Sequence, residues 1–222
     1  MNFSCDYVDS ELIWDENYHI NELIVESPVA LRNILQNLFM EKDKPTVHFT
    51  AKGKPISLKK DIDVVSSPLQ LDFNNRKAMT ALLKLLAKDS LSESFYVDTN
   101  NFKSEIIRYL NTIINSESFA FELDTEDFAI DDIAKAVGLH IVNDEDDFIE
   151  QLADYMAMMT ELVKTKLFVF INLRSLITDG ELAKLIGNIY DHQLDVLLIE
   201  NQQHGRINEV DRIIIDRDMC EI

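Results

Sequence analysis

The chain has 222 residues, 46% of them hydrophobic, and carries 21 Lys and Arg against 40 Asp and Glu, so its formal net charge is −19. This length and hydrophobic content suit one elaborated domain or two small ones, and they exclude global disorder. The negative charge repels nucleic acid, so a nucleic-acid partner would require a segregated basic surface and cations that neutralise some of the carboxylates.

The sequence carries no sign of export or of membrane insertion. Its N-terminal residues lack a basic region followed by an apolar run, and no stretch approaches the roughly 18 consecutive apolar residues of a membrane helix. Cys5 and Cys220 lie near opposite ends without metal or redox spacing. We therefore expect a cytoplasmic protein with reduced thiols.

The N-terminal part is predicted to contain one helix followed by short strands. Ser27-Pro28 is a helix start, with a serine cap and a proline at the first helical position. Residues 45–65 are predicted to form short strands, with a turn in which Gly53 adopts a positive φ.

The middle of the chain predicts four helices, beginning near residues 75, 102, 127 and 148. Asn74 or Asn75 can cap the first. The third is predicted to point Val137 inward and to end at Gly138, where a left-handed cap is expected.

The C-terminal quarter is rich in β-branched and aromatic residues. The runs 167–171, 196–199 and 213–215 are continuously apolar, which is typical of strands buried on both faces of a parallel sheet. Between the first two, Thr178-Asp179-Gly180-Glu181 is a capping box that opens a helix. We predict an α/β head domain with a largely parallel sheet, built from residues 1–74 and 165–222, and an inserted α-helical leg domain of residues 75–164.

The sequence contains no recognisable motif for catalysis or for nucleotide binding. The five glycines form neither GxxxxGK[ST] nor GxGxxG, so backbone amides cannot wrap a pyrophosphate in the usual way. The five histidines show no HExxH spacing, and no GxSxG elbow is present. We therefore assign no catalytic residue.

Carboxylates form the densest chemical signal. Glu122, Asp124, Glu126 and Asp127 fall within six residues, and a cation among them would relieve their mutual repulsion. Calcium accepts six to eight such oxygens in loose geometry. The alternative is that these acids, and a second run at residues 144–147, only favour the positive ends of helix dipoles.

Basic residues are fewer but segregated. Lys77, Lys84 and Lys88 share one helical face, and Lys103 and Arg108 lie on the next predicted helix. Such a stripe is either an ordinary solvated face or a surface that follows DNA phosphates. The absence of interleaved aromatics favours duplex DNA bound without sequence readout.

Several segments in order resemble one known family. They are NFS at 2–4, DIDVV at 61–65, LDFN at 71–74, IAKAVG at 133–138, KLFVFIN at 166–172, LITDGE at 176–181 and LDVLLIE at 194–200. Together they resemble the ring-forming spacer-acquisition (adaptation) accessory protein of type II-A CRISPR–Cas systems.

The resemblance implies an α/β head similar to a P-loop ATPase core without working nucleotide machinery, and a helical leg. It also implies a homotetrameric ring that encircles double-stranded DNA from free ends, with no catalysis. Calcium bound by leg carboxylates would support the ring, with Glu122 and Asp124 at matching acidic positions. The implied partners are the adaptation integrase complex and the effector nuclease of the same locus.

Two other classes of function stay open on the residues alone. A nucleotide hydrolase on the head would require a phosphate site of unusual form. A structural acidic adaptor would bind proteins only, and its lysine stripe would be a solvated face.

Overall fold

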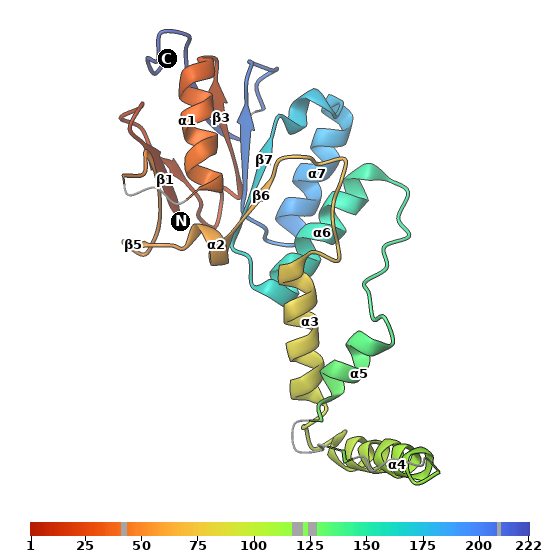
Figure 1. The fold of residues 1–222 in the computed structure, drawn as a ribbon. Coiled ribbons are helices and arrows are strands. Elements are labelled where there is room, and N and C mark those ends of the chain that lie inside the picture. Colours follow the sequence, from red (N-terminus) through yellow and green to blue (C-terminus); the bar gives the residue numbers. More distant parts are fainter. Residues whose placement is uncertain (41–43, 117–121, 124–127, 208–209) are drawn as a thin grey trace. The chain divides into compact units, whose positions relative to one another are not determined.

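The computed structural model spans residues 1–222 and describes all of them except 41–43, 117–121, 124–127 and 208–209 (Figure 1). The chain forms two compact units. The first comprises residues 1–72 and 143–222, and the second comprises residues 73–142. The sequence-based division had placed residues 143–164 in the helical part, whereas in the structure they belong to the first unit.

A parallel five-stranded sheet forms the centre of the first unit. Its strand order is β6-β7-β8-β3-β9, and every neighbouring pair is parallel. The strands are β3 (Ile20–Val25), β6 (Ile62–Val65), β7 (Leu167–Ile171), β8 (Val196–Glu200) and β9 (Asp211–Ile215). Every residue of β7 and β8 is buried, which confirms the α/β class and the burial predicted for the runs 167–171 and 196–199. The third run, 213–215, lies on the edge strand β9, where Ile214 is only half-buried.

A smaller antiparallel sheet has the order β2-β1-β4-β5. Its strands are β1 (Asn2–Cys5), β2 (Leu12–Ile13), β4 (Val47–Ala51) and β5 (Lys54–Pro55). The turn between β4 and β5 places Gly53 at a φ of +71°, as its position predicted. Residues 58–61 form a short helix, α2 (Leu58–Asp61), rather than strand.

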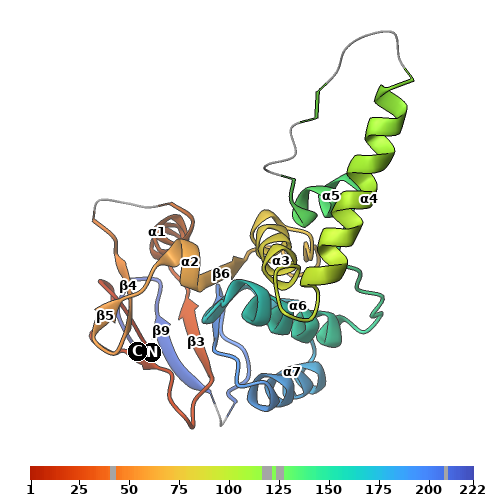
Figure 2. The same ribbon diagram turned by 90° about the horizontal axis from the view of Figure 1, so that it is seen from below.

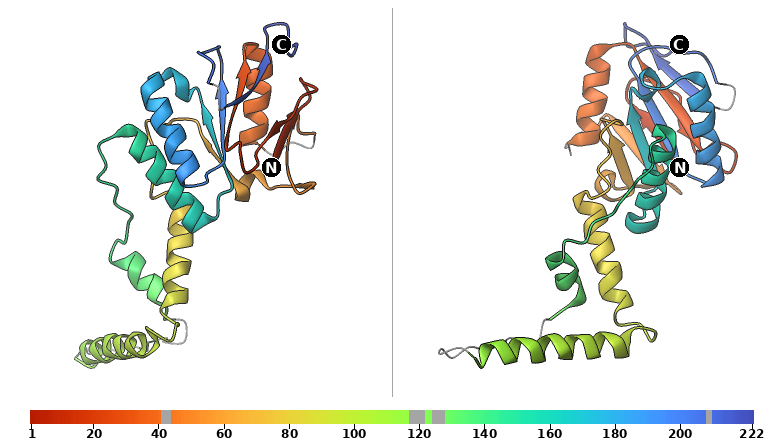
Figure 3. Two further views of the ribbon diagram at one scale, coloured as in Figure 1. Left: turned by 180° about the vertical axis from the view of Figure 1, so that it is seen from behind. Right: turned by 90° about the vertical axis from the view of Figure 1, so that its right-hand side faces the viewer.

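Helices cover both faces of the parallel sheet. The helix α1 (Pro28–Phe39) shares a core with both sheets and lies on one face, while α7 (Asp179–Asp191) lies on the other (Figures 2 and 3). The helix α6 (Phe148–Val163) packs against α7. This packing explains why α6 belongs to the first unit: its buried face, with Leu152, Tyr155 and Met159, completes that unit's core.

Helix starts in the first unit follow their sequence signals. The Ser27 hydroxyl accepts a hydrogen bond from the Ala30 amide, with Pro28 at the first helical position. Both halves of the capping box are present at α7, where Thr178 accepts from the Glu181 amide and the Glu181 carboxylate accepts from the Thr178 amide.

The second unit contains α3 (Arg76–Asp89), α4 (Tyr96–Ile114) and α5 (Ile130–Ala136), with α5 packed on α3. Its two chain ends are joined by the Asn74 side-chain amide, which donates to the Ile141 carbonyl at 2.9 Å and accepts from the Ile141 amide at 2.7 Å. Gly138 adopts a φ of +74°, as predicted. The inward orientation predicted for Val137 is wrong: α5 ends at Ala136, and Val137 is 75% exposed.

No helix among the described residues is long and apolar enough to cross a membrane. Cys5 is buried, Cys220 is exposed, and both are free thiols.

Candidate nucleic-acid interface

The helix α3 presents a row of lysines. It begins at Asn75, whose side-chain oxygen accepts hydrogen bonds from the Lys77 and Ala78 amides. Lys77, Lys84 and Lys88 are all exposed. At 100° per residue they fall within about 40° of one another around the helix axis, and they span about 16 Å along it. One strand of duplex DNA carries about five phosphates over that length.

The opposite face of α3 is apolar, which explains the orientation of the lysines. Ala78 is buried, and Leu82, Leu83 and Leu86 are half-buried on the far side of the helix from the lysine row. Because this apolar face packs within the unit, the lysines are held toward solvent. The structure therefore places the three lysines on one face, as their spacing predicted. Which partner the row binds stays a prediction.

The charge of α3 differs in sign from that of the chain as a whole. Residues 76–89 hold four basic residues and one acidic residue, and that acidic residue, Asp89, is the last of the helix. The chain as a whole has a net charge of −19. A polyanion can therefore approach this helix more favourably than it can approach the average surface.

Lys103 and Arg108 lie on α4, which runs in a different direction from α3 (Figure 3). The Lys103 ammonium lies 5.9 Å from the centroid of the Phe128 ring, in a cation–π arrangement, and its side chain is half-buried. Arg108 is exposed. The two are five positions apart along the helix, so they point about 140° apart and do not form one row.

The acidic segment is described only in part. Glu122 is exposed, whereas Asp124, Glu126 and Asp127 lie outside the described residues. In the first turn of α5, Asp131 and Asp132 both bind the Lys135 ammonium, at 3.0 and 2.9 Å. In the part of the chain that the structure describes, no three His, Cys, Asp or Glu side chains come together to hold a metal ion.

The second acidic run has a structural role. Asp147 is the N-cap of α6, and its carboxylate accepts hydrogen bonds from the Ile149 and Glu150 amides. It also lies 3.1 Å from the Lys184 ammonium. The helix-start amides, chiefly that of Glu150, and then Lys184 lower the pKa of Asp147. This interaction matches the alternative reading, in which acids at a helix start favour its positive end.

The connection after β3 fits the absence of phosphate-loop glycines. Glu26 and Ser27 alone separate the strand from α1, and Pro28, which has no amide hydrogen, occupies the first helical position. A two-residue connection of this kind provides too few backbone amides to surround a triphosphate.

Sequence reasoning did not find a cluster of buried charges in the first unit. The Glu22 carboxylate, fully buried on β3, binds the guanidinium groups of Arg174 and Arg212. Glu200, fully buried at the end of β8, accepts a hydrogen bond from the Arg174 amide at 3.0 Å. The available signal was a glutamate within an apolar strand run, because a buried charge needs a partner.

Comparisons with known proteins agree with the family resemblance found in the sequence. The family model described as CRISPR-associated protein (Cas_Csn2) matches residues 40–219. A CRISPR-associated protein Csn2 of Enterococcus faecalis is 29% identical over 147 residues, which are 64% of this chain and 64% of that protein. The match thus spans less than two thirds of the length of that curated relative.

Among solved structures, the chain is similar to a putative ABC transporter ATP-binding protein from Pyrococcus furiosus. The TM-score is 0.36 and the identity 12%, over 91% of this chain and 86% of that one. Similarity at this level assigns no activity, and the fold class here is established by the strand order itself.

Proposed function

Because the chain belongs to the Csn2 family of CRISPR-associated proteins, the adaptation accessory proteins of type II-A systems, we propose that it binds the ends of double-stranded DNA during acquisition of new spacers. In this proposal the protein forms a homotetrameric ring around linear duplex, calcium stabilises the ring, and no catalysis takes place. Its partners are the integrase complex and the effector nuclease of the same locus, in the cytoplasm.

The observation that carries the DNA proposal is the lysine row of α3. Three exposed lysines lie on one face of α3, without an acidic residue between 76 and 88, and they give this helix a positive surface on an acidic chain. Contacts of this kind are individually weak and carry no sequence information. Four copies around one duplex would add their contacts, so that avidity replaces single-site affinity.

Calcium enters the proposal through the acidic segment at residues 122–127. Its density of carboxylates suits a hard cation with oxygen ligands, and neutralising it would also reduce repulsion toward DNA. When bound, the ion would supply positive charge and a fixed arrangement of the segment. Because most of the segment lies outside the described residues, this part of the proposal rests on composition and family.

The test of the proposal is a gel-shift comparison of linear duplex with the same DNA as a covalently closed circle, each with calcium and with a calcium chelator. Binding of the linear form alone, and only with calcium, supports a ring that threads on from ends. Equal binding of both forms refutes encirclement and leaves a surface patch. No binding to either form refutes the DNA proposal and favours a protein adaptor.

The lysine row is tested by the triple variant K77Q/K84Q/K88Q. The logarithm of the DNA-binding constant falls with the logarithm of salt concentration, and each lost phosphate contact makes that slope less steep by about 0.9. The variant should therefore reduce the magnitude of the slope by up to about 2.7 per protomer. A matched control is the removal of three exposed charges from the first unit, Lys44, Lys54 and Arg217 to Gln. An equal fall in slope for both variants would show that net charge matters and the α3 face does not.

A further inference from the structure

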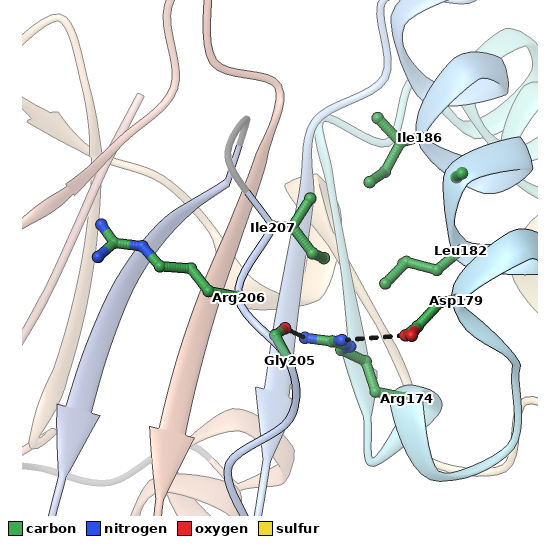
Figure 4. A pocket seen from close by; sticks show the side chains of 8 residues that line it. Arg174, Asp179, Leu182, Ile186, Gly205, Arg206 and Ile207 are labelled. Atoms are coloured by element: carbon green, nitrogen blue, oxygen red, sulfur yellow. Dashed lines mark hydrogen bonds and ion pairs between the residues drawn. The ribbon is translucent and has the colours of Figure 1, made fainter.

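A cavity of about 400 Å³ opens beside the buried charges of the first unit. Leu182 and Ile186 of α7 form one apolar wall, and the segment after β8 contributes Gly205 and Ile207 (Figure 4). The Arg174 side chain, from the short turn after β7, lies between the two walls. A volume of this size suits a small organic molecule, and the lining is divided about evenly between polar and apolar surface.

Among the described residues that line the cavity, Arg174 is one of three that are charged, the others being Asp179 and Arg206. Arg174 is buried, with 3% of its side chain exposed. Its Nη1 donates to the Glu22 carboxylate at 2.9 Å and to the Gly205 carbonyl at 3.0 Å. Its Nη2 lies 3.8 Å from the Asp179 carboxylate, too far for a hydrogen bond. Asp179 is 97% exposed, so water screens this pairing strongly.

The charge around Arg174 is not fully compensated. Arg174 and Arg212 share the single carboxylate of Glu22. The second buried carboxylate, Glu200, has a pKa raised to about 7, chiefly by burial, so it is partly protonated near neutral pH. Burial lowers the pKa of the neighbouring His204, which keeps that ring neutral. Two guanidinium groups therefore face fewer than two full negative charges.

Arg206 also lines the cavity, but its side chain extends away from Arg174 (Figure 4). The positive charge inside the cavity is therefore that of Arg174. Because Nη1 already donates to a carboxylate and a carbonyl, the group best suited to meet the remaining Nη2 is an anionic oxygen acceptor. The side chains of Leu182, Ile186 and Ile207 supply apolar contact, which favours an anion that carries an apolar body over a bare inorganic ion.

We infer that this cavity is a binding site for a small anionic molecule, in which a carboxylate or phosphate binds Arg174 and an apolar body lies between Leu182 and Ile207. The Asp179 carboxylate, exposed and 3.8 Å from Nη2, is the weak competitor that such an anion would displace. The ligand site is separate from the DNA proposal, because it uses neither α3 nor the acidic segment at 122–127.

The test is isothermal titration of the full chain with phenyl phosphate, benzoate and inorganic phosphate in chloride buffer. We expect one saturable site per chain for at least one of the two aromatic anions, with weaker binding of inorganic phosphate. Preference for phenyl phosphate identifies a phosphate ligand, and preference for benzoate identifies a carboxylate ligand. Absence of saturation by either at about 10 mM overturns the inference, because the affinity would then be too weak for a built site.

Variants around the cavity separate a site from general charge. Ala183 lines the cavity but is exposed and contacts none of the ion pairs, so Ala183→Phe should fill the space without unfolding the protein. We expect that variant to abolish binding and Ala183→Ser to preserve it. Asp179→Asn removes the competing carboxylate and should tighten binding about two- to five-fold, the value of an exposed ion pair. Unchanged binding in Ala183→Phe overturns the inference.

Discussion

Replacing Glu200 by glutamine should stabilise the first unit at alkaline pH and have little effect at acidic pH. Glutamine preserves the oxygen that accepts from the Arg174 amide. The other carboxylate oxygen, Oε2, is buried without a hydrogen-bond partner in the described part of the chain, and the same holds for His204 Nε2, 3.5 Å away. An amide nitrogen at the Oε2 position could donate to that ring nitrogen.

The sign of the effect follows from the direction of the pKa shift. Glu200 has a pKa of about 7 in the folded chain against an ordinary value of 4.5. The folded state therefore holds a proton that the unfolded state releases between these values. The free energy of unfolding is unaffected by this group below about pH 4.5, falls as the pH rises toward 7, and then levels off. The full loss is about 3 kcal/mol, and glutamine avoids it because it does not ionise.

Urea unfolding at about pH 5 and about pH 8 measures the effect. Trp14 is the single tryptophan of the chain and is buried, and its indole donates to the Val196 carbonyl of β8 at 3.0 Å, so its fluorescence reports on this unit. Glu16→Gln, at an exposed glutamate, is the control and should change neither midpoint appreciably. If the advantage of Glu200→Gln is the same at both pH values, or falls as the pH rises, the proposed cost of the buried carboxylate is wrong.

Three further predictions concern two helix starts and one partly buried hydrogen bond. Asn75→Ala removes the cap of α3 and should cost about 1 kcal/mol in urea unfolding followed by circular dichroism, and an unchanged midpoint would contradict this. Tyr155→Phe removes the hydroxyl that donates to Asp63 at 2.8 Å and should cost about 2 kcal/mol, and equal stability would show that the bond adds nothing. Asp147→Asn should lower the thermal midpoint near neutral pH, because the pKa of Asp147 is lowered by the amides of α6 and by Lys184, so its ionised form stabilises the fold. That deficit should disappear as the pH falls below 3.8 and the native carboxylate is protonated, so a deficit that persists there would contradict the explanation.

Local signals in the sequence located those elements whose determinants lie within a few residues. The capping box at Thr178 and Glu181, the proline after Ser27 and the positive φ of Gly138 depend only on neighbouring backbone, and the structure contains all three. The buried strands followed from their continuous apolar runs, because both faces of the parallel sheet are covered by helices.

Helix starts without a capping side chain were placed less well. The second helix of the middle segment was predicted from about residue 102, whereas α4 begins at Tyr96, and its N-cap residue Phe95 makes no side-chain capping bond. The third was predicted from near residue 127, and α5 begins at Ile130 after Ala129, which makes none either. Such starts are decided by packing, which a local pattern does not contain.

The buried ionic cluster could not be predicted from local sequence patterns, because its residues are far apart along the chain. Glu22 and Arg174 are 152 positions apart, and Glu22 and Arg212 are 190 apart. Arg212 meets Glu22 because β9 pairs with β3, and Arg174 reaches Glu22 from the turn after β7, which lies on the other side of β8 in the sheet. The lysine row of α3 was deduced from spacing alone, and its role as a DNA-binding surface stays a prediction.

The two hydrogen bonds between the Asn74 side chain and the Ile141 backbone have an architectural consequence. They hold the beginning and the end of residues 73–142 beside each other, so this stretch enters and leaves at nearly one point. A segment attached in this way is an inserted domain. It can lengthen, shorten or be exchanged for another while the sheet keeps its strand order. Changes of the inserted domain between related chains would then have little effect on the stability of the α/β unit, and a short linker could replace the inserted domain.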